Sequence, residues 1–140
     1  MIIDHVALEV DDIDERVRLL EAAGLRVLRR GTRYSTGQQI VMMGDGTGSK
    51  LELIEAGPGT EDGNGGTPVF AHLALRTDDA DGAHRRLQDA GYESRSEPHD
   101  LTAARARSAL LDSGGGLRVQ VISYADDSPD AVTWEPSGER

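Results

Sequence analysis

The sequence contains an internal repeat, and this repeat constrains the fold more than any other feature. The stretch from His5 to Gly24 returns 67 positions later as His72 to Gly91, with ten identities across the twenty aligned residues. The identities include the histidine, an Ala-Leu pair, an Asp-Asp pair and the closing Ala-Gly. Self-similarity of this kind indicates that the chain folds as two copies of one structural unit. Each copy begins with a segment that carries a histidine.

Each copy is predicted to contain strands and one helix in the order βαβββ. Alternation of side chains predicts a first strand over residues 2–10, and Ile13, Val17 and Leu20 form the apolar stripe of a helix. This helix is capped by Asp11 or Asp12 and ends at Gly24. The remaining strands of the first copy are predicted over residues 25–30, 38–43 and 50–55. The second copy is predicted to have a helix over residues 79–90, capped near Asp78 or Asp79, and strands over residues 69–76, 92–96, 106–112 and 117–123.

The domain organisation follows from the repeat. The chain of 140 residues is long enough for one domain, residues 1–140, with a core of its own. We divide it into a repeat unit over 2–55, a linker over 56–68, a second repeat unit over 69–123 and an acidic tail over 124–140. The linker is rich in glycine and proline, which favours an irregular connection. We expect an irregular stretch over 97–104 and a largely loose tail.

Composition excludes several classes of function. The chain has no cysteine, which rules out disulfides, thiolate metal sites and cysteine nucleophiles. Its net charge is −10 and no basic patch is visible, so we expect no nucleic-acid partner. No apolar run is long enough for a signal or a membrane span, so we expect no membrane partner and a cytoplasmic protein.

Four polar residues share matched positions in the two copies. On the first strand, Val6, Leu8 and Val10 point one way and His5 the other. Glu52 on the fourth strand likewise points away from its leucine neighbours. The second copy repeats this arrangement with His72 and Gln120, the latter 68 positions after Glu52. We expect a pseudo-twofold relation to bring all four side chains to one concave surface.

This set of side chains suits a divalent metal ion. Neutral imidazoles and carboxylate oxygens are ligands for Zn²⁺, Ni²⁺, Co²⁺, Fe²⁺ or Mn²⁺, and a glutamine can add a neutral oxygen. With one carboxylate, the site keeps about one positive charge. Such a charge can hold an oxygen-rich substrate and stabilise an enolate as it forms.

The chain resembles the vicinal oxygen chelate superfamily, which contains glyoxalases, methylmalonyl-CoA epimerases, extradiol dioxygenases and bleomycin resistance proteins. The resemblance covers residues 2–123 and is carried by DHVALEV at 4–10, KLELIEA at 50–56, HLALRTDD at 72–79 and LRVQVI at 117–122. It implies an α+β fold in which two βαβββ repeats form a curved mixed β-sheet around a central cavity.

The resemblance also implies which residues bind the metal. The family's ligands lie on the first and last strands of each unit, which correspond to His5, Glu52, His72 and Gln120. In ligand types the chain is most similar to methylmalonyl-CoA epimerase and glyoxalase I. The epimerases usually carry the carboxylate on the last strand and the glutamine earlier, and this chain has the two exchanged.

Other residues are predicted to line the site or to pack elsewhere. Arg76 and Arg118 share faces with His72 and Gln120 and can bind a substrate carboxylate or phosphate; the alternative is that they pair with Glu9 or Glu52. Gln39 and Met43 are further candidates for substrate binding, and one of Met42 and Met43 lines the site while the other belongs to the core. We interpret His84 as a packed structural histidine and His99 as a surface residue. The predicted catalytic base is Glu52. The residues predicted to bind substrate are Arg76, Arg118, Gln39 and Met43. The predicted metal ligands are His5, Glu52, His72 and Gln120.

Three functions remain open at this stage. The first is a metal-dependent lyase or isomerase, glyoxalase- or epimerase-like, that acts on a small α-oxygenated carbonyl or carboxylate through a metal-bound enolate. The second is a metal-free protein of the bleomycin resistance type that sequesters a ligand. Such a protein is expected to have an aromatic pocket, and this chain has few aromatic residues for one: one Phe, one Trp and three Tyr. The third is an Fe²⁺ extradiol-type dioxygenase, whose relatives place the carboxylate where this chain has Gln120. Members of this size are commonly homodimers.

Overall fold

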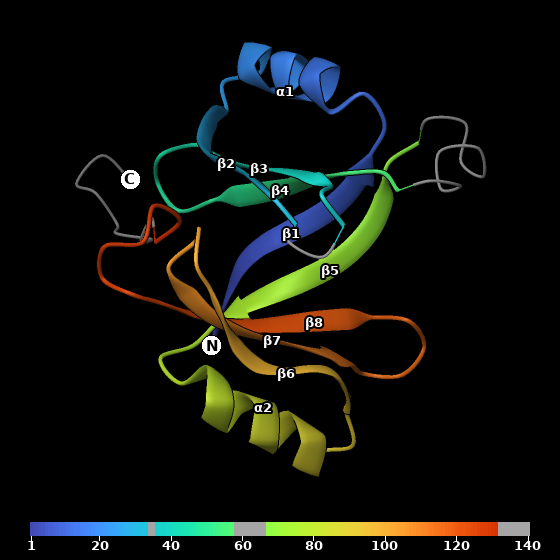
Figure 1. The fold of residues 1–140 in the computed structure, drawn as a ribbon, viewed down its shortest axis with the longest axis vertical. Helices are drawn as coiled ribbons and strands as arrows, with labels where there is room; N and C mark the ends of the chain where they lie inside the picture. The colour runs from blue at the N-terminus through green and yellow to red at the C-terminus, as the bar shows by residue number, and fades with distance from the viewer. Residues whose placement is uncertain (34–35, 58–66, 132–140) are drawn as a thin grey trace. The chain divides into compact units, whose positions relative to one another are not determined.

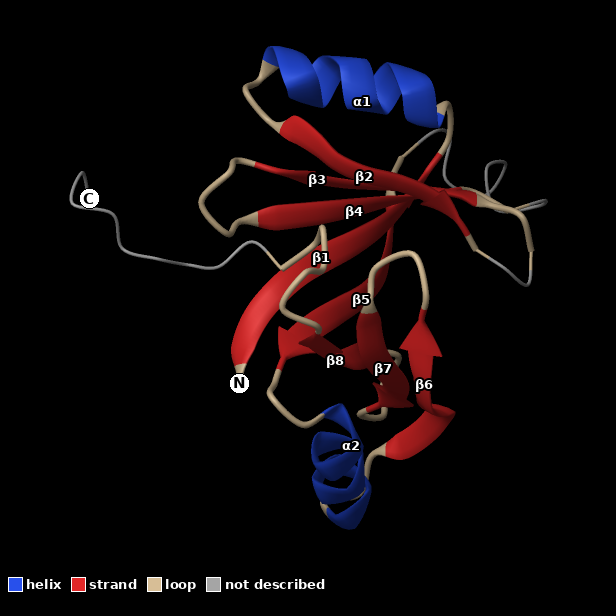
Figure 2. Ribbon diagram, turned by 60° about the vertical axis from the view of Figure 1, so that its left-hand side comes forward, coloured by secondary structure: helices blue, strands red, loops and turns tan. Residues whose placement is uncertain are grey.

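The computed structural model describes residues 1–33, 36–57 and 67–131, and its elements follow the repeat (Figures 1 and 2). The predicted fold class is confirmed: the order is βαβββ twice, and the sheet is mixed because β5 and β8 run parallel whereas β7 and β8 run antiparallel. The first repeat contains β1 (Ile2–Val10), α1 (Ile13–Ala22), β2 (Arg26–Thr32), β3 (Gln39–Gly44) and β4 (Lys50–Glu55). The second contains β5 (Val69–Arg76), α2 (Ala80–Asp89), β6 (Glu93–Leu101), β7 (Ala106–Asp112) and β8 (Arg118–Tyr124).

The described residues form two compact units whose limits differ from those of the repeats. The α1 unit consists of residues 7–33, 36–57 and 67–70, and the α2 unit of residues 1–6 and 71–131. The strand order is β2-β3-β4-β1 in the α1 unit and β1-β5-β8-β7-β6 in the α2 unit. Both boundaries fall inside strands, so the N-terminal part of β1, which carries His5, belongs to the α2 unit.

The α1 unit has its core between α1 and one face of the strands. One cluster contains the buried residues Val10, Ile13, Val17, Val41, Met43 and Leu53, and Leu8 and Leu51 pack against it. The alternation along β4 therefore sends Leu51 and Leu53 toward α1 and Glu52 to the opposite face. Met42, the partner of Glu52 in the β3–β4 register, shares that face.

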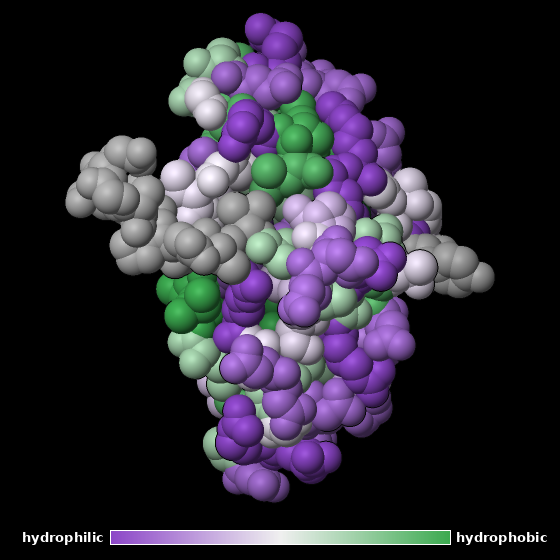
Figure 3. All heavy atoms as spheres, turned by 90° about the vertical axis from the view of Figure 1, so that its left-hand side faces the viewer, coloured by the Kyte–Doolittle hydropathy of each residue, from purple (hydrophilic) through white to green (hydrophobic). Residues whose placement is uncertain are grey.

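The α2 unit has a second core that is built from smaller residues. Its buried cluster contains Ala80, Ala83, Ala109, Leu111 and Val121, and Leu87 and Tyr92 pack against this cluster. Val121 points toward α2, so its neighbour Gln120 points to the opposite face of β8. His84 is 2% exposed and its Nε2 lies 2.8 Å from Ser94 Oγ, which confirms it as a packed structural histidine. Hydrophilic side chains cover the exposed side of α2 at the lower end of Figure 3.

The helix ends repeat as the sequence predicts. Asp12 caps α1 and Asp79 caps α2, each by accepting a hydrogen bond from a backbone N–H three residues later. Gly24 and Gly91 follow the helices at φ +107°, where a glycine is favoured because it has no Cβ. The next residue donates to Leu20 in the first repeat and to Leu87 in the second, which completes a Schellman motif in each. Among the described residues, no helix has the length and apolarity needed to span a membrane.

Two sequence expectations are corrected by the second repeat. The stretch 97–104 is largely not irregular, because β6 continues to Leu101 as an edge strand. The edge accommodates Pro98, which lies where the pairing with β7 shifts register between Ser96 and His99.

The expectation of a loose tail is wrong for residues 125–131. The Ala125 N–H donates to the carbonyl of Arg105, the Ser128 hydroxyl donates to the carbonyl of Ala104, and Asp130 is buried. Residues 58–66, which make up most of the predicted linker, lie outside the described part of the chain, as do residues 132–140.

Candidate functional site

The two repeat histidines meet in the α2 unit, on the neighbouring strands β1 and β5. Their ring centroids lie 5.5 Å apart and the ring planes are inclined by 73°, an edge-to-face arrangement. His5 is 2% exposed, His72 is partly buried, and the Nε2 atoms of both rings are buried. The structure therefore brings together the histidine pair that the repeat predicts.

Asp4 orients the ring of His5. The Asp4 Oδ2 atom lies 2.6 Å from His5 Nδ1 and accepts a second hydrogen bond of 2.5 Å from the Tyr124 hydroxyl. Since an ionised carboxylate can only accept, Nδ1 must carry the proton, and in a neutral ring this leaves the lone pair on Nε2. Metal-binding histidines are commonly held by a carboxylate in this way.

Sequence reasoning missed Asp4, which contacts His5, and Tyr124, which contacts Asp4. The signal for Asp4 in the sequence is an acidic residue next to a histidine in a mostly apolar strand. Tyr124 gives no signal, because it is 120 positions away from Asp4.

Gln120 presents a buried carbonyl oxygen. Its side-chain amide donates to Ser108 Oγ over 2.8 Å, and Ser108 is itself 3% exposed. The Oε1 atom is buried and has no hydrogen-bond partner among the described residues. In the parallel register Gln120 pairs with Ala74, two residues after His72, so Gln120 and His72 share one face of the sheet. A buried acceptor without a partner requires an explanation, and a bound cation or ligand donor would provide one.

Glu52 occupies the corresponding face of the α1 unit. It is partly buried on β4, opposite Met42, and the buried Lys50 lies two residues earlier on the same face. The predicted direction of Glu52, away from α1, agrees with the core on the other side of β4. Its roles as metal ligand and base stay predictions.

The two candidate arginines have different surroundings. The Arg76 guanidinium lies 4.9 Å from the centroid of the Tyr124 ring, a cation–π contact next to the residue that holds Asp4. Arg118 is exposed and pairs in register with Asp112 at the start of β8. Arg76 is thus the better placed of the two to act near His5.

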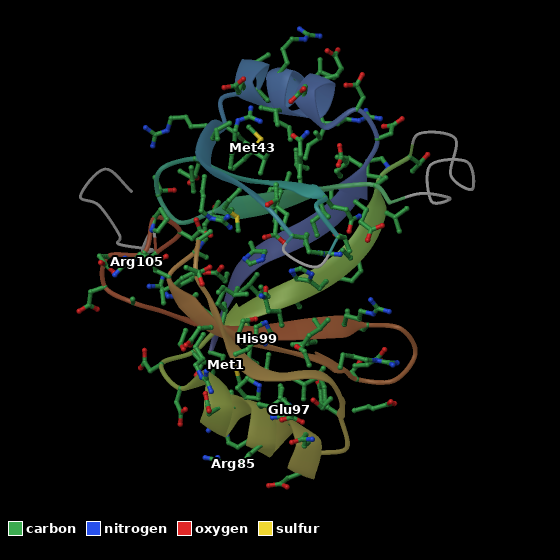
Figure 4. The ribbon with its side chains drawn as sticks, viewed as in Figure 1. Met1, Met43, Arg85, Glu97, His99 and Arg105 are labelled. Carbon is green, nitrogen blue, oxygen red and sulfur yellow. The ribbon has the colours of Figure 1, made fainter. Side chains whose placement is uncertain are left out.

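The assignment of Met43 to substrate binding is wrong. Met43 is fully buried in the cluster beneath α1 (Figure 4), whereas Met42 lies on the face of Glu52. The sequence places one methionine on each face, and only the strand register decides which is which. Gln39 is exposed at the start of β3, where its backbone N–H donates to the Glu55 carboxylate over 3.4 Å, and its role stays a prediction.

A cavity of about 500 Å³ opens in the α2 unit beside Tyr124. It is lined mainly by polar residues at the ends of β6, β7 and β8, among them Asp100, Arg105, Arg107 and Ser123. Arg107 pairs with Asp81 at 2.8 Å and with Asp100 at 3.2 Å, and its guanidinium holds the pKa of Asp81 below the usual range. Pockets of this volume bind small molecules.

A comparison with known protein families identifies the family of this chain. Residues 2–121 match the sequence model of the Glyoxalase/Bleomycin resistance protein/Dioxygenase superfamily. The chain belongs to this superfamily. The match includes nearly all of both βαβββ repeats, so the resemblance stated from the motifs is confirmed.

Several solved structures share the fold. Methylmalonyl-CoA epimerase of Streptomyces coelicolor, in complex with 2-nitronate-propionyl-CoA, is 21% identical over 91% of this chain and 97% of its own, with a TM-score of 0.75. The epimerase of Mycobacterium tuberculosis is 22% identical over 88% of this chain and 87% of its own, with a TM-score of 0.75. A hypothetical protein of Bacillus halodurans is 20% identical over 90% and 96%, with a TM-score of 0.72. No curated protein sequence matches the chain.

Proposed function

We propose that this member of the superfamily is a divalent-metal-dependent lyase or isomerase that acts on a small α-oxygenated carbonyl or carboxylate compound. The observation that carries the proposal is the edge-to-face pair of His5 and His72 with His5 oriented by Asp4. The buried Oε1 of Gln120 on the face of His72 supports it.

The residues fit a metal of intermediate hardness. His5, His72 and Glu52 would hold the ion, and Gln120 would add a neutral oxygen. Two imidazoles with one carboxylate suit Zn²⁺, Ni²⁺, Co²⁺, Fe²⁺ or Mn²⁺. When bound, the ion would supply positive charge that stabilises negative charge on the substrate oxygens.

The protein's own residues divide the remaining work. Glu52 is the proposed general base for a C–H next to the carbonyl, since a carboxylate is an ordinary proton acceptor. Arg76 is the proposed contact for an anionic group of the substrate, with Arg118 as the more exposed second candidate. The likeness to methylmalonyl-CoA epimerases favours an isomerase reaction within this range. The homodimer and the cytoplasmic location stay predictions from the sequence.

Metal analysis of the purified protein tests the proposal. We expect about one divalent ion per chain in the wild-type protein and loss of the ion in His5→Ala and Glu52→Ala. His99→Ala is the matched control, because His99 is an exposed histidine on β6 of the α2 unit (Figure 4) and should keep the metal.

A wild-type protein that binds none of the five metals would overturn the proposal. It would favour the metal-free ligand-binding protein of the bleomycin resistance type. Oxygen consumption with a catechol by the Fe²⁺-loaded protein would instead favour the dioxygenase. The neutral Gln120, where related dioxygenases carry a carboxylate, argues against that outcome.

A further inference from the structure

We propose that Asp4 and Tyr124 form a clamp, hereafter the Asp4–Tyr124 clamp, that fixes the imidazole of His5 with its Nε2 lone pair directed at a metal ion. The predicted effect of the clamp on metal affinity rests on the proposed function. The predicted effect on the tautomer of His5 is independent of the proposed function, because the tautomer is a property of the metal-free protein.

The clamp is a short chain of hydrogen bonds, of which the Asp4–His5 bond is buried and the Tyr124–Asp4 bond is partly buried. A single oxygen, Asp4 Oδ2, lies 2.6 Å from His5 Nδ1 and 2.5 Å from the Tyr124 hydroxyl. Asp4 is 5% exposed and His5 2%. Burial keeps bulk water from competing for the Asp4–His5 hydrogen bond, so this bond holds the imidazole more firmly than it would at the surface.

The clamp serves one histidine and is not part of the repeat. The residue 67 positions after Asp4 is Ala71, which has no carboxylate to offer His72. The repeat retains the histidine and the residues around it, but Asp4 occurs in the first copy alone. A carboxylate confined to one copy indicates a role specific to His5, because a general need of the strand would apply to both copies.

Two contacts hold the ring of Tyr124 in place. Its ring lies 4.9 Å from the Arg76 guanidinium and packs against the small apolar cluster of Ala104, Ala106 and Ile122. With the ring held, the hydroxyl can reach Asp4 without the entropy cost of ordering a mobile side chain. Tyr124 also lines the cavity of about 500 Å³, so a molecule bound there would contact the residue that positions Asp4.

The clamp predicts a defined tautomer. In the metal-free wild-type protein, at a pH where the ring is neutral, His5 should be protonated on Nδ1 and unprotonated on Nε2. Partners of this kind typically change metal affinity by about 10- to 100-fold. Asp4→Asn should therefore mix the two tautomers and weaken metal binding by about 10-fold or more. Tyr124→Phe should weaken it less, because it leaves the carboxylate in place.

The experiment combines nitrogen NMR of the histidine rings with Zn²⁺ titration by calorimetry. Both are applied to the wild-type protein, Asp4→Asn and Tyr124→Phe. The matched controls are Asp112→Asn, which changes another buried carboxylate of the α2 unit, and Tyr92→Phe, which removes only the hydroxyl of a ring packed against the core of that unit. Both controls should keep the wild-type tautomer and affinity.

Two results would overturn the clamp. One is a wild-type His5 protonated on Nε2; the other is an Asp4→Asn or Tyr124→Phe protein whose tautomer and Zn²⁺ affinity equal those of the controls. Should Asp4→Asn fail to fold, Tyr124→Phe still decides, since it removes a single oxygen atom. A wild-type protein with the expected tautomer but no metal binding would support the clamp and overturn the proposed function.

Discussion

The side-chain amide of Gln120 contacts Ser108. Its nitrogen donates to Ser108 Oγ over 2.8 Å, and its carbonyl oxygen Oε1 is left for the face of His72. We expect this hydrogen bond to hold the amide in place.

Removing this neighbour should disturb the candidate site. In Ser108→Ala the amide nitrogen loses its acceptor, so we expect metal affinity to fall by about tenfold, by calorimetric titration. Ser94→Ala is the matched control, because it removes a partly buried serine contact from His84 in the same unit. Equal affinities in the two variants would show that Ser108 does not orient Gln120.

The carboxylate of Asp112 is held by a backbone N–H and by an arginine. The Gly114 N–H donates to its carboxylate over 2.8 Å, and Arg95 lies 3.4 Å away. The Gly114 hydrogen bond, followed by Arg95, holds the pKa of Asp112 below its ordinary value of 3.8. A carboxyl whose pKa is lowered by folding stabilises the native state above its unfolded pKa.

This shift gives a pH-dependent prediction. The stability difference between the wild-type protein and Asp112→Asn should be full above pH 3.8 and should shrink as the pH falls through the lower, folded pKa. Urea denaturation at a series of pH values measures the difference. A difference that grows on acidification would contradict the assignment.

At the scale of elements, the two helices end in the same motif. The φ angle of +107° at Gly24 and Gly91 is unfavourable for any residue with a Cβ, although no atom lies within 4 Å of either position. The space is open, so a substitution there acts through the backbone alone.

Alanine at either glycine should therefore destabilise the protein to a similar degree. We expect Gly24→Ala and Gly91→Ala each to lower the free energy of unfolding by about 1–2 kcal/mol, measured by chemical denaturation. Each variant is the control for the other. A loss of unfolding free energy in one variant and none in the other would show that the two turns do not contribute equally to stability.

The cap of α2 gives a second test at this scale. Asp79 accepts from the Gly82 N–H over 3.0 Å, so Asp79→Ala should cost about 1 kcal/mol in the same assay. Asp78 is exposed and is not the cap, and Asp78→Ala should stay within about 0.5 kcal/mol of wild type. Reversed effects would place the cap one residue earlier.

Elements were predictable wherever local chemistry decides them. The caps at Asp12 and Asp79, the closing glycines and the central strands follow from patterns within a few residues. The extension of β6 was not predictable, because Pro98 argues against a strand unless the strand is known to lie at an edge. Met43 was misassigned for a related reason, since its direction depends on the register with β4.

The whole molecule is divided differently in sequence and in space. The repeats begin at β1 and β5, yet both strands cross the boundary between the compact units. Each unit therefore depends on strand residues that continue into the other. The histidine pair was predictable from the repeat, whereas the Asp4–Tyr124 clamp was not, because no local pattern relates its members.

Shared strands should make unfolding cooperative. We expect one thermal transition in calorimetry, with equal calorimetric and van't Hoff enthalpies. Leu53→Ala in the α1 unit and Leu111→Ala in the α2 unit should each shift that single transition, at a cost of about 2–5 kcal/mol. Two resolved transitions, one displaced by each variant, would show that the units unfold independently.

The contact between Asp4 and Tyr124 also bears on how the protein is made. The residues are 120 positions apart, so the ribosome adds the second long after the first has emerged. Until β5 has been synthesised, the N-terminal segment of β1 lacks the strand beside which it lies in the α2 unit, and an unpaired strand is prone to association with other chains. The Asp4 side chain must wait longer still for Tyr124. The surroundings of His5 are thus completed only after the second repeat has been synthesised, although His5 lies on the first strand of the first repeat.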